Sequence, residues 1–324
     1  MNRLRITVFA DPVCTWCWGS VPVLRALTYR YGEQVNISYV VGVMIENIET
    51  YKNRRLSIGG DIALSNRNIN ANWLEASAQH GMPVCESGFH LFSKEHTSTM
   101  PQCRAYVTAR HYAAESRGRI SATAAMHYLR HLQEATAVDA EQTCDINFLS
   151  ALSATAGFVP SKFQELYYSD AVVQLLRGDK ALCRDYDVTT FPTFTLEYHN
   201  EELMLRGYSS YEIFSQSISQ LTFNNIRPIN DGRELFSAEN VKDFIQMYGT
   251  AYPVEIAAAF GLTRKNGHSA LNAESYIGLP DVMAQLIESQ TVAMAPKGNG
   301  FIYYAIKDPG NVAQQTGRRL VGVV

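Results

Sequence analysis

The chain has 324 residues, which is too long for one ordinary domain and suits two. Its composition, 46% hydrophobic and 18% charged, is that of a globular protein with a substantial core, and no apolar run is long enough to cross a bilayer. The formal net charge of −3 gives no electrostatic reason to expect nucleic acid or an anionic membrane as the main partner.

The beginning of the chain predicts a strand and not a targeting segment. Residues 4–10 are mostly apolar, but Arg5 interrupts them, and no small-residue cleavage site follows. The chain contains six cysteines, of which only two are closely spaced. That usage suits a reducing compartment, where a disulfide is transient and catalytic. We therefore expect a cytoplasmic protein.

The two closely spaced cysteines, Cys14 and Cys17, follow this strand and open a helix. Apolar residues recur about one helical turn apart from Val21 to Tyr31, which predicts a helix over residues 17–31. A thiol at a helix N-terminus loses its proton more readily than a free thiol, because unpaired N–H groups and the helix dipole favour an anion. Cys14 is therefore the expected nucleophile, and Cys17, one turn further on, can resolve a mixed disulfide.

Two other uses of a Cys-x-x-Cys pair are weaker here. A zinc site needs a second pair, and the remaining cysteines are scattered singly, at Cys85, Cys103, Cys144 and Cys183. A purely structural disulfide this local would constrain the unfolded chain little. The redox interpretation is favoured, with no metal and no cofactor.

The rest of the first 225 residues continues an α/β pattern. A run of β-branched and aromatic residues at 35–41 predicts a second strand, parallel to the first, with the cysteines at the carboxyl end of the first strand. Residues 48–168 predict a series of helices, which we interpret as an insertion into the sheet. A helix at 170–186, a strand entered at Pro192, a second strand at 202–206 and a helix at 209–221 complete the unit.

This order of elements resembles the thioredoxin fold in its DsbA-like form. The motifs that carry the resemblance are the cysteine pair after the first strand, the helical insertion, and a late Phe-Pro-Thr at 191–193. Residues 11–19 (DPVCTWCWG), 101–105 (PQCRA), 191–193 (FPT) and 206–208 (RGY) are similar to the cytosolic FrnE-like branch. The resemblance covers residues 1–225 and implies a thiol–disulfide oxidoreductase that acts on protein or peptide disulfides.

The resemblance also implies roles for individual residues. Pro192 would be the cis-proline that faces the active disulfide, leaving the backbone of Phe191 free to pair with an extended substrate. Trp16 and Thr190 would join Phe191 in the substrate groove, which the bulk of Phe191 should narrow. Related families that use glutathione carry serine at the first cysteine, so Cys14 argues against them. Because the two residues between the cysteines lack the histidine of DsbA, the resemblance implies a less oxidising couple.

Three further residues could carry chemistry, on weaker grounds. Cys103 belongs to the PQCRA motif, and a buried packing role is favoured for it. His127 and His131 share one helix face at the spacing of a two-histidine metal site, but no glutamate follows His127. Solvated or packing histidines are therefore favoured.

The chain beyond a polar linker at 226–236 predicts a second, α+β domain at 237–324. Helices at 237–247, 253–260 and 280–289 are followed by strands at 291–295 and 301–306 around the turn PKGNG. This order resembles a small winged helix. Residues 226–324 carry equal numbers of acidic and basic residues, and the third helix has no Lys or Arg, so DNA is not the expected partner. A contact with another protein, or a cover over the substrate, is favoured.

Three functions therefore compete. The leading one is a dithiol–disulfide oxidoreductase that uses Cys14 and Cys17. The second is an adaptor that holds another protein on a thioredoxin-like frame, with the cysteines at most a redox switch. The third, a redox-responsive transcription factor, is disfavoured by the charge balance of the second domain. The direction of the redox reaction, the natural substrate and the oligomeric state stay open.

Overall fold

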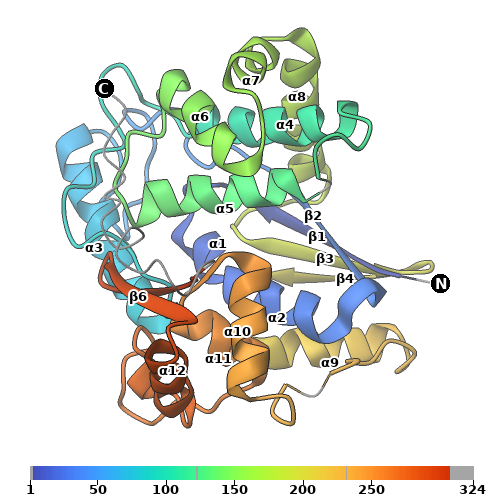
Figure 1. The fold of residues 1–324 in the computed structure, drawn as a ribbon. Helices are drawn as coiled ribbons and strands as arrows, with labels where there is room; N and C mark the ends of the chain where they lie inside the picture. The colour runs from blue at the N-terminus through green and yellow to red at the C-terminus, as the bar shows by residue number, and fades with distance from the viewer. Residues whose placement is uncertain (1–2, 122, 231, 307–324) are drawn as a thin grey trace.

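A four-stranded mixed sheet forms the centre of the N-terminal part (Figure 1). The computed structural model describes residues 3–121, 123–230 and 232–306. The strands are β1 (Leu4–Ala10), β2 (Val35–Val41), β3 (Thr193–Tyr198) and β4 (Glu201–Arg206), in the spatial order β2-β1-β3-β4. β1 and β2 are parallel, as the strand-helix-strand spacing predicts, and β3 is antiparallel to both of its neighbours.

Helices cover both faces of this sheet. The lower face in Figure 1 is covered by α2 (Val21–Tyr31) and α9 (Tyr211–Leu221), whose apolar sides pack on Leu4, Ile6 and Leu196 of the strands. The upper face is covered by helices of the insertion. The insertion and the helix after it comprise α3 (Ile62–His80), α4 (Met100–Glu115), α5 (Ala124–Ala137), α6 (Ile146–Ser153), α7 (Pro160–Tyr167) and α8 (Asp170–Asp185).

The helix predicted over residues 17–31 is divided in two. It begins earlier, as α1 (Thr15–Gly19), breaks at Ser20 and resumes as α2. Pro22 causes the break, because it has no N–H to donate to the carbonyl of the preceding turn. The Ser20 hydroxyl satisfies one carbonyl near the break by donating to the Trp16 oxygen at 2.8 Å. The prediction of one continuous helix was therefore wrong, although both halves are helical.

A partly buried ion pair closes the outer edge of β2. Asp179 of α8 accepts a hydrogen bond of 3.0 Å from the Val41 N–H, and Arg110 of α4 donates one of 2.8 Å to the Tyr39 carbonyl. The two side chains also bind each other through two contacts, the shorter of 2.8 Å. An unpaired sheet edge can pair with another chain, so these two side chains occupy backbone groups that would otherwise be free.

The C-terminal part has the element order of a winged helix. It comprises α10 (Ala238–Tyr248), β5 (Thr250–Ala251), α11 (Pro253–Phe260), α12 (Leu279–Glu288), β6 (Val292–Lys297) and β7 (Gly300–Ala305). The three strands form an antiparallel sheet in the order β5-β7-β6. The two-residue strand β5 lies outside the sequence prediction, because so short a strand leaves no alternating pattern. The hairpin turn is also tighter than predicted, with only Gly298 and Asn299 between the strands.

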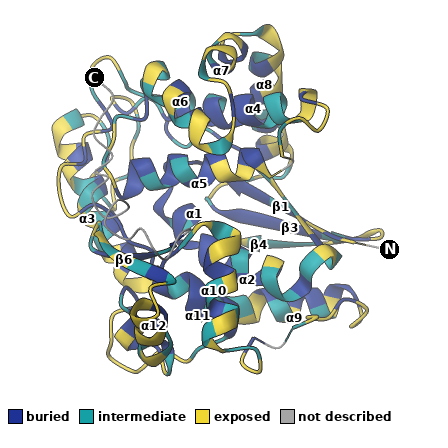
Figure 2. Ribbon diagram, in the orientation of Figure 1, coloured by how far each residue is buried: buried dark blue, intermediate teal, exposed yellow. Residues whose placement is uncertain are grey.

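The C-terminal part packs closely against the rest of the chain. Figure 2 shows α11 largely buried, whereas α12 has an exposed outer face. At the hairpin tip, Asn299 donates its N–H to the Val84 carbonyl and accepts the Val84 N–H on its side chain, both at 2.9 Å. A Cβ on Gly298 would lie 2.4 Å from the Val84 carbonyl oxygen, and its φ is +55°, so this approach requires glycine. The tip is thus held against the segment that follows α3.

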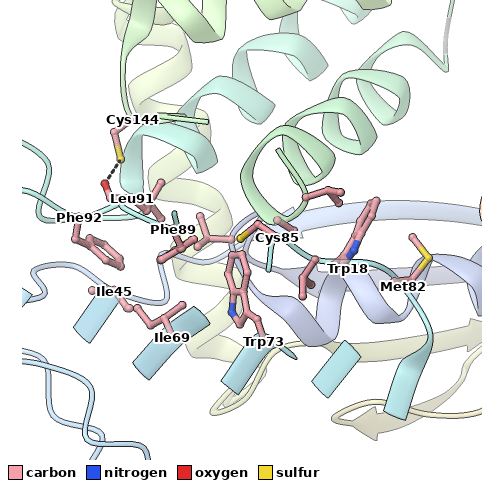
Figure 3. Close-up of a cluster of buried hydrophobic side chains, with 14 of the residues drawn as sticks. Trp18, Ile45, Ile69, Trp73, Met82, Cys85, Phe89, Leu91, Phe92 and Cys144 are labelled. Atoms are coloured by element: carbon pink, nitrogen blue, oxygen red, sulfur yellow. Dashed lines mark hydrogen bonds between the residues drawn. The ribbon is translucent and has the colours of Figure 1, made fainter. Parts of the chain in front are cut away.

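One hydrophobic cluster joins the redox motif, the insertion and the C-terminal part. Trp18 lies at one end beside Met82, while Trp73 and Phe89 pack in the middle with ring centroids 4.7 Å apart (Figure 3). The same cluster includes Tyr252 and Ile302 from the C-terminal part. The core that supports the cysteines is therefore completed by residues more than two hundred positions away.

Candidate active site

The cysteine pair lies at the carboxyl end of β1, on the turn that leads into α1. Cys14 is the N-cap of α1, and its N–H donates to the Asp11 carbonyl at 3.0 Å. Both cysteines are free thiols and both are buried, Cys14 to 6% and Cys17 to 4% of full exposure. Of these two cysteines, only Cys14 lines the large cleft described below. The two thiols are therefore nearly equal in burial but differ in what they face.

The environment of Cys17 opposes its ionisation. Burial raises the pKa of the Cys17 thiol well above its ordinary value, and the neighbouring Cys14 thiol adds to the rise. A hydrogen bond from the Asp11 backbone acts in the other direction but is outweighed. Cys17 is thus held as a protonated thiol in the reduced pair.

The late proline motif faces the first cysteine. The Cys14 thiol donates to the Phe191 carbonyl with an Sγ–O distance of 3.4 Å, and the Phe191–Pro192 peptide bond is cis. Trp16, Thr190 and Phe191 line the same cleft as Cys14. Pro192 is buried beneath them and accepts the Gly207 N–H at 2.8 Å. The structure therefore places Trp16, Thr190 and Phe191 around Cys14 in one cleft, with Pro192 buried next to Phe191.

The cleft beside Cys14 has a volume of about 1200 Å³. One wall is formed by Phe191 and the segment before it. The lining also includes residues 42–46 after β2, residues 51–58, and α3, which contributes Trp73. Lys180, Cys183 and Arg184 of α8 line the cleft as well. Sequence reasoning missed this part of the lining, because most of it consists of loop residues without periodicity.

Asp11 is a buried carboxylate that sequence reasoning did not select. It accepts the N–H groups of Val13 and Met44, both at 2.8 Å, and the hydroxyl of Thr99 at 2.7 Å. The Cys103 thiol lies 3.6 Å from the same carboxylate. Burial raises the pKa of Asp11 to about 6, although these hydrogen bonds act to lower it. Its place three residues before Cys14, at the end of a buried strand, is the signal that could have found it.

His80 is a second buried group beside the motif. Its Nδ1 accepts the Met82 N–H at 3.0 Å, which leaves the proton on Nε2, 3.4 Å from the Thr15 hydroxyl. The ring lies edge-on to Trp16, with centroids 5.6 Å apart. Burial lowers the pKa of His80 to about 3, so the ring is neutral. His80 ends α3, so its position beside the cysteines depends on how the insertion packs.

The other candidate residues lie apart from the pair or only indirectly beside it. Cys103 is fully buried in α4, and its thiol reaches the site through the Asp11 carboxylate and the Gly42 carbonyl. His127 and His131 both lie on α5, and the described part of the chain contains no group of three His, Cys, Asp or Glu side chains that could hold a metal ion. Among the described helices, none is long and apolar enough to span a membrane.

Comparisons with known proteins identify the family and the fold. A family model described as thioredoxin matches residues 7–216. A curated relative, the ClpXP adapter protein SpxH of Bacillus subtilis, is 24% identical over 69% of this chain and 70% of its own length. A Nitrosomonas europaea structure that carries the provisional description of protein disulfide isomerase is 18% identical, with a TM-score of 0.56, and covers 69% of this chain and 100% of its own.

A second solved structure shares the fold. A probable DsbA oxidoreductase from Streptomyces coelicolor is 17% identical, with a TM-score of 0.50, and covers 73% of this chain and 95% of its own. These likenesses confirm the predicted α/β fold class, in which a helical insertion interrupts a thioredoxin-like sheet. Since the family model covers well over half of the sequence, the chain belongs to the thioredoxin family and has its DsbA-like form.

Proposed function

We propose that this protein is a thiol–disulfide oxidoreductase that acts on protein or peptide substrates through Cys14 and Cys17. The observation that carries the proposal is the position of Cys14, which lines the cleft 3.4 Å from the Phe191 carbonyl, with Cys17 buried one turn behind it. A substrate disulfide in the cleft would meet the sulfur of Cys14 and not that of Cys17.

The chemistry in the reducing direction consists of two exchanges. The Cys14 thiolate attacks one sulfur of the substrate disulfide, which forms a mixed disulfide and releases the first substrate thiolate. Cys17 then loses its proton and attacks the Cys14 sulfur, which releases the second substrate thiolate and leaves a Cys14–Cys17 disulfide. Two electrons pass to the substrate, and an external dithiol must reduce the enzyme again. The reverse sequence would oxidise a dithiol substrate.

Phe191 would hold the substrate backbone during these steps. Its carbonyl contacts the Cys14 thiol, and its ring lines the cleft together with Trp16. An extended substrate segment beside Cys14 can donate an N–H to that carbonyl, as in other cases of strand addition. Trp16, Thr190, Phe191 and Pro192 are therefore proposed as substrate-binding residues, and no metal or cofactor takes part.

Trapping with Cys17→Ala tests this proposal. A protein that lacks Cys17 cannot resolve its mixed disulfides, so substrates should stay covalently bound to Cys14 and leave when a reductant is added. The Cys14→Ala,Cys17→Ala protein should retain none of them. Cys144→Ala is the matched control, because Cys144 is another buried thiol but does not line the cleft. Disulfide reductase activity that survives Cys14→Ala unchanged would refute the proposal.

A second candidate function is an adaptor that binds another protein without turning it over. The observation that favours it is the name of the curated relatives, ClpXP adapter protein SpxH, at 24% identity. The same pair of variants separates the two functions. A partner held equally by Cys17→Ala and by the double variant, in the presence of reductant, would favour the adaptor.

A further inference from the structure

A second cavity lies where the N-terminal and C-terminal parts meet. Its volume is about 840 Å³. One wall comes from Tyr208 and the start of α9, and the other from α11 and the segment that follows it, including Arg264. The N-terminal fold supplies only one side, so the C-terminal part completes this cavity.

The second cavity adjoins the redox cleft. Gln79 lines both of them. Trp16, which lines the redox cleft, packs against His80 and Tyr208, which line the second cavity, with ring centroids 5.6 and 5.7 Å apart. Each of these two ring-to-ring distances is shorter than the length of two residues of extended chain, at about 3.3 Å per residue. A polypeptide bound across Trp16 would therefore reach the second cavity within a few residues of its reacting cysteine.

The walls of the second cavity are positively charged. They include three arginines and one glutamate, Glu212, a formal excess of two positive charges. His80 adds none, since it is neutral. Arg30 is fixed by a hydrogen bond of 2.9 Å from Nε to the Ala259 carbonyl. The Arg233 Nε likewise donates to the Gly261 carbonyl at 3.0 Å.

Arg233 and Arg264 are both exposed, but the Arg233 guanidinium is held by the Gly261 carbonyl and by the Thr263 hydroxyl, to which its Nη2 donates at 2.7 Å. The charge of Arg264 opposes the rise in pKa that burial causes at the hydroxyl groups of Tyr208 and Tyr276, so it acts on both walls of the cavity. A guanidinium group can bind a carboxylate through two parallel hydrogen bonds. An exposed arginine that lines the cavity, with two phenol groups beside it, suits a ligand that carries carboxylates.

We propose that the second cavity binds an acidic segment of a protein substrate, located a few residues from the cysteine that reacts with Cys14. The inference rests on the proposed oxidoreductase function and adds a substrate class to it. It also gives the C-terminal part a role, because that part supplies Arg264 and Arg233. Glutathione also carries two carboxylates, but its ammonium group offsets one of them, so an acidic segment of a protein offers more negative charge.

Binding tests the subsite without any redox step. The Cys14→Ser,Cys17→Ser protein is titrated into fluorescent peptides that lack cysteine and contain either a run of glutamates or a run of glutamines. We expect the glutamate peptide to bind about tenfold more tightly at low salt, equivalent to about 1.4 kcal/mol, and to lose this advantage at high salt. Arg264→Glu should abolish the preference. Arg67→Glu, on an exposed position of α3 outside both cavities, should keep it.

Exchange rates then connect the subsite to the cysteines. With active protein, disulfides of cysteine-containing glutamate peptides should be reduced about tenfold faster than those of glutamine peptides, and Arg264→Glu should remove the difference while leaving oxidised glutathione reduction unchanged. Three results would overturn the subsite. They are equal binding of the glutamate and glutamine peptides, a loss of the preference with Arg67→Glu equal to that with Arg264→Glu, and an equal effect of Arg264→Glu on the reduction of oxidised glutathione. If acidic peptides bind through Arg264 but no disulfide is reduced, the proposed oxidoreductase function fails and the anion-binding site stands.

Discussion

Cys14 and Cys17 are almost equally buried, so exposure alone does not assign their roles. Their surroundings do. Cys14 faces the cleft and the Phe191 carbonyl, whereas Cys17 is enclosed and its pKa is raised by burial and by Cys14. A thiol that is hard to ionise reacts only when its target is held next to it, as the Cys14 sulfur of a mixed disulfide would be. Two further titratable groups, Asp11 and His80, are buried beside this pair.

Asp11 should make the protein less stable as the pH rises. Its pKa of about 6 exceeds the ordinary 3.8, so the folded state prefers the protonated carboxyl. The stabilising contribution is complete below pH 4 and is lost as the pH rises through 6, with a total of about 3 kcal/mol. We expect the free energy of unfolding of the wild type, relative to Asp11→Asn, to fall by about this amount between pH 4 and pH 7. Urea unfolding at a series of pH values measures it, and a difference that does not change with pH would contradict the assignment.

His80 should have the opposite effect. Its pKa of about 3 lies below the ordinary 6.5, so the folded state prefers the neutral ring. Its contribution is complete above pH 6.5 and is lost as the pH falls, by about 3 kcal/mol between pH 7 and pH 4. The advantage of the wild type over His80→Gln should shrink accordingly in the same unfolding series. The two variants control for each other, because they should change the pH dependence of the free energy of unfolding with opposite signs.

At the scale of elements, the sequence predicted most strands and helices but not the walls of the site. Strands β1 and β2 match their predicted limits because apolar β-branched runs mark them clearly, with Pro12 soon after the first and Gly42 directly after the second. The break at Ser20 was missed, since apolar periodicity passes through Pro22 without interruption. The cleft wall at residues 51–58 could not be predicted, because loop residues reach the site only through the packing of the insertion.

The ion pair that closes the edge of β2 shows how the insertion supports the sheet. Asp179→Ala would leave the Val41 N–H and the Arg110 guanidinium without their acceptor, so we expect a loss of about 2–3 kcal/mol in the free energy of unfolding. Lys162→Ala, which removes an exposed pair with Glu165, should cost less than about 0.5 kcal/mol. Urea unfolding of both variants compares them. Equal effects of the two substitutions would mean that the Arg110–Asp179 pair contributes no more than an exposed surface pair.

At the scale of the whole molecule, the hairpin of the C-terminal part is used for an internal contact. In a winged helix the hairpin and the third helix are the elements that can meet DNA, but here the tip binds Val84, and Lys297 pairs with Asp139 of the insertion. Tyr252 and Ile302 share a core with Trp18. The C-terminal part therefore serves the stability of the redox motif and the second cavity, which agrees with a role in holding protein substrates.

Glu255 is the buried charge that joins the C-terminal part to the N-terminal part. It is fully buried on α11, and its carboxylate lies 3.0 Å from Arg25 of α2 and 3.1 Å from Arg130 of α5. The Arg130 guanidinium in turn lies 4.3 Å from the centre of the Trp18 ring. Glu255→Ala would leave two buried arginines facing each other without an anion. We therefore expect a loss of about 3–5 kcal/mol in the free energy of unfolding.

The control is Glu288→Ala on the exposed face of α12, which should change stability by less than about 0.5 kcal/mol. Hydrogen exchange shows which helices the Glu255→Ala substitution destabilises. If the ion triad joins the two parts, Glu255→Ala should speed exchange in α2 and α5 as well as in α11, because all three helices lose the same carboxylate. Faster exchange confined to the C-terminal part would show that the N-terminal fold holds the redox motif in place by itself, and that the C-terminal part acts on the substrate alone.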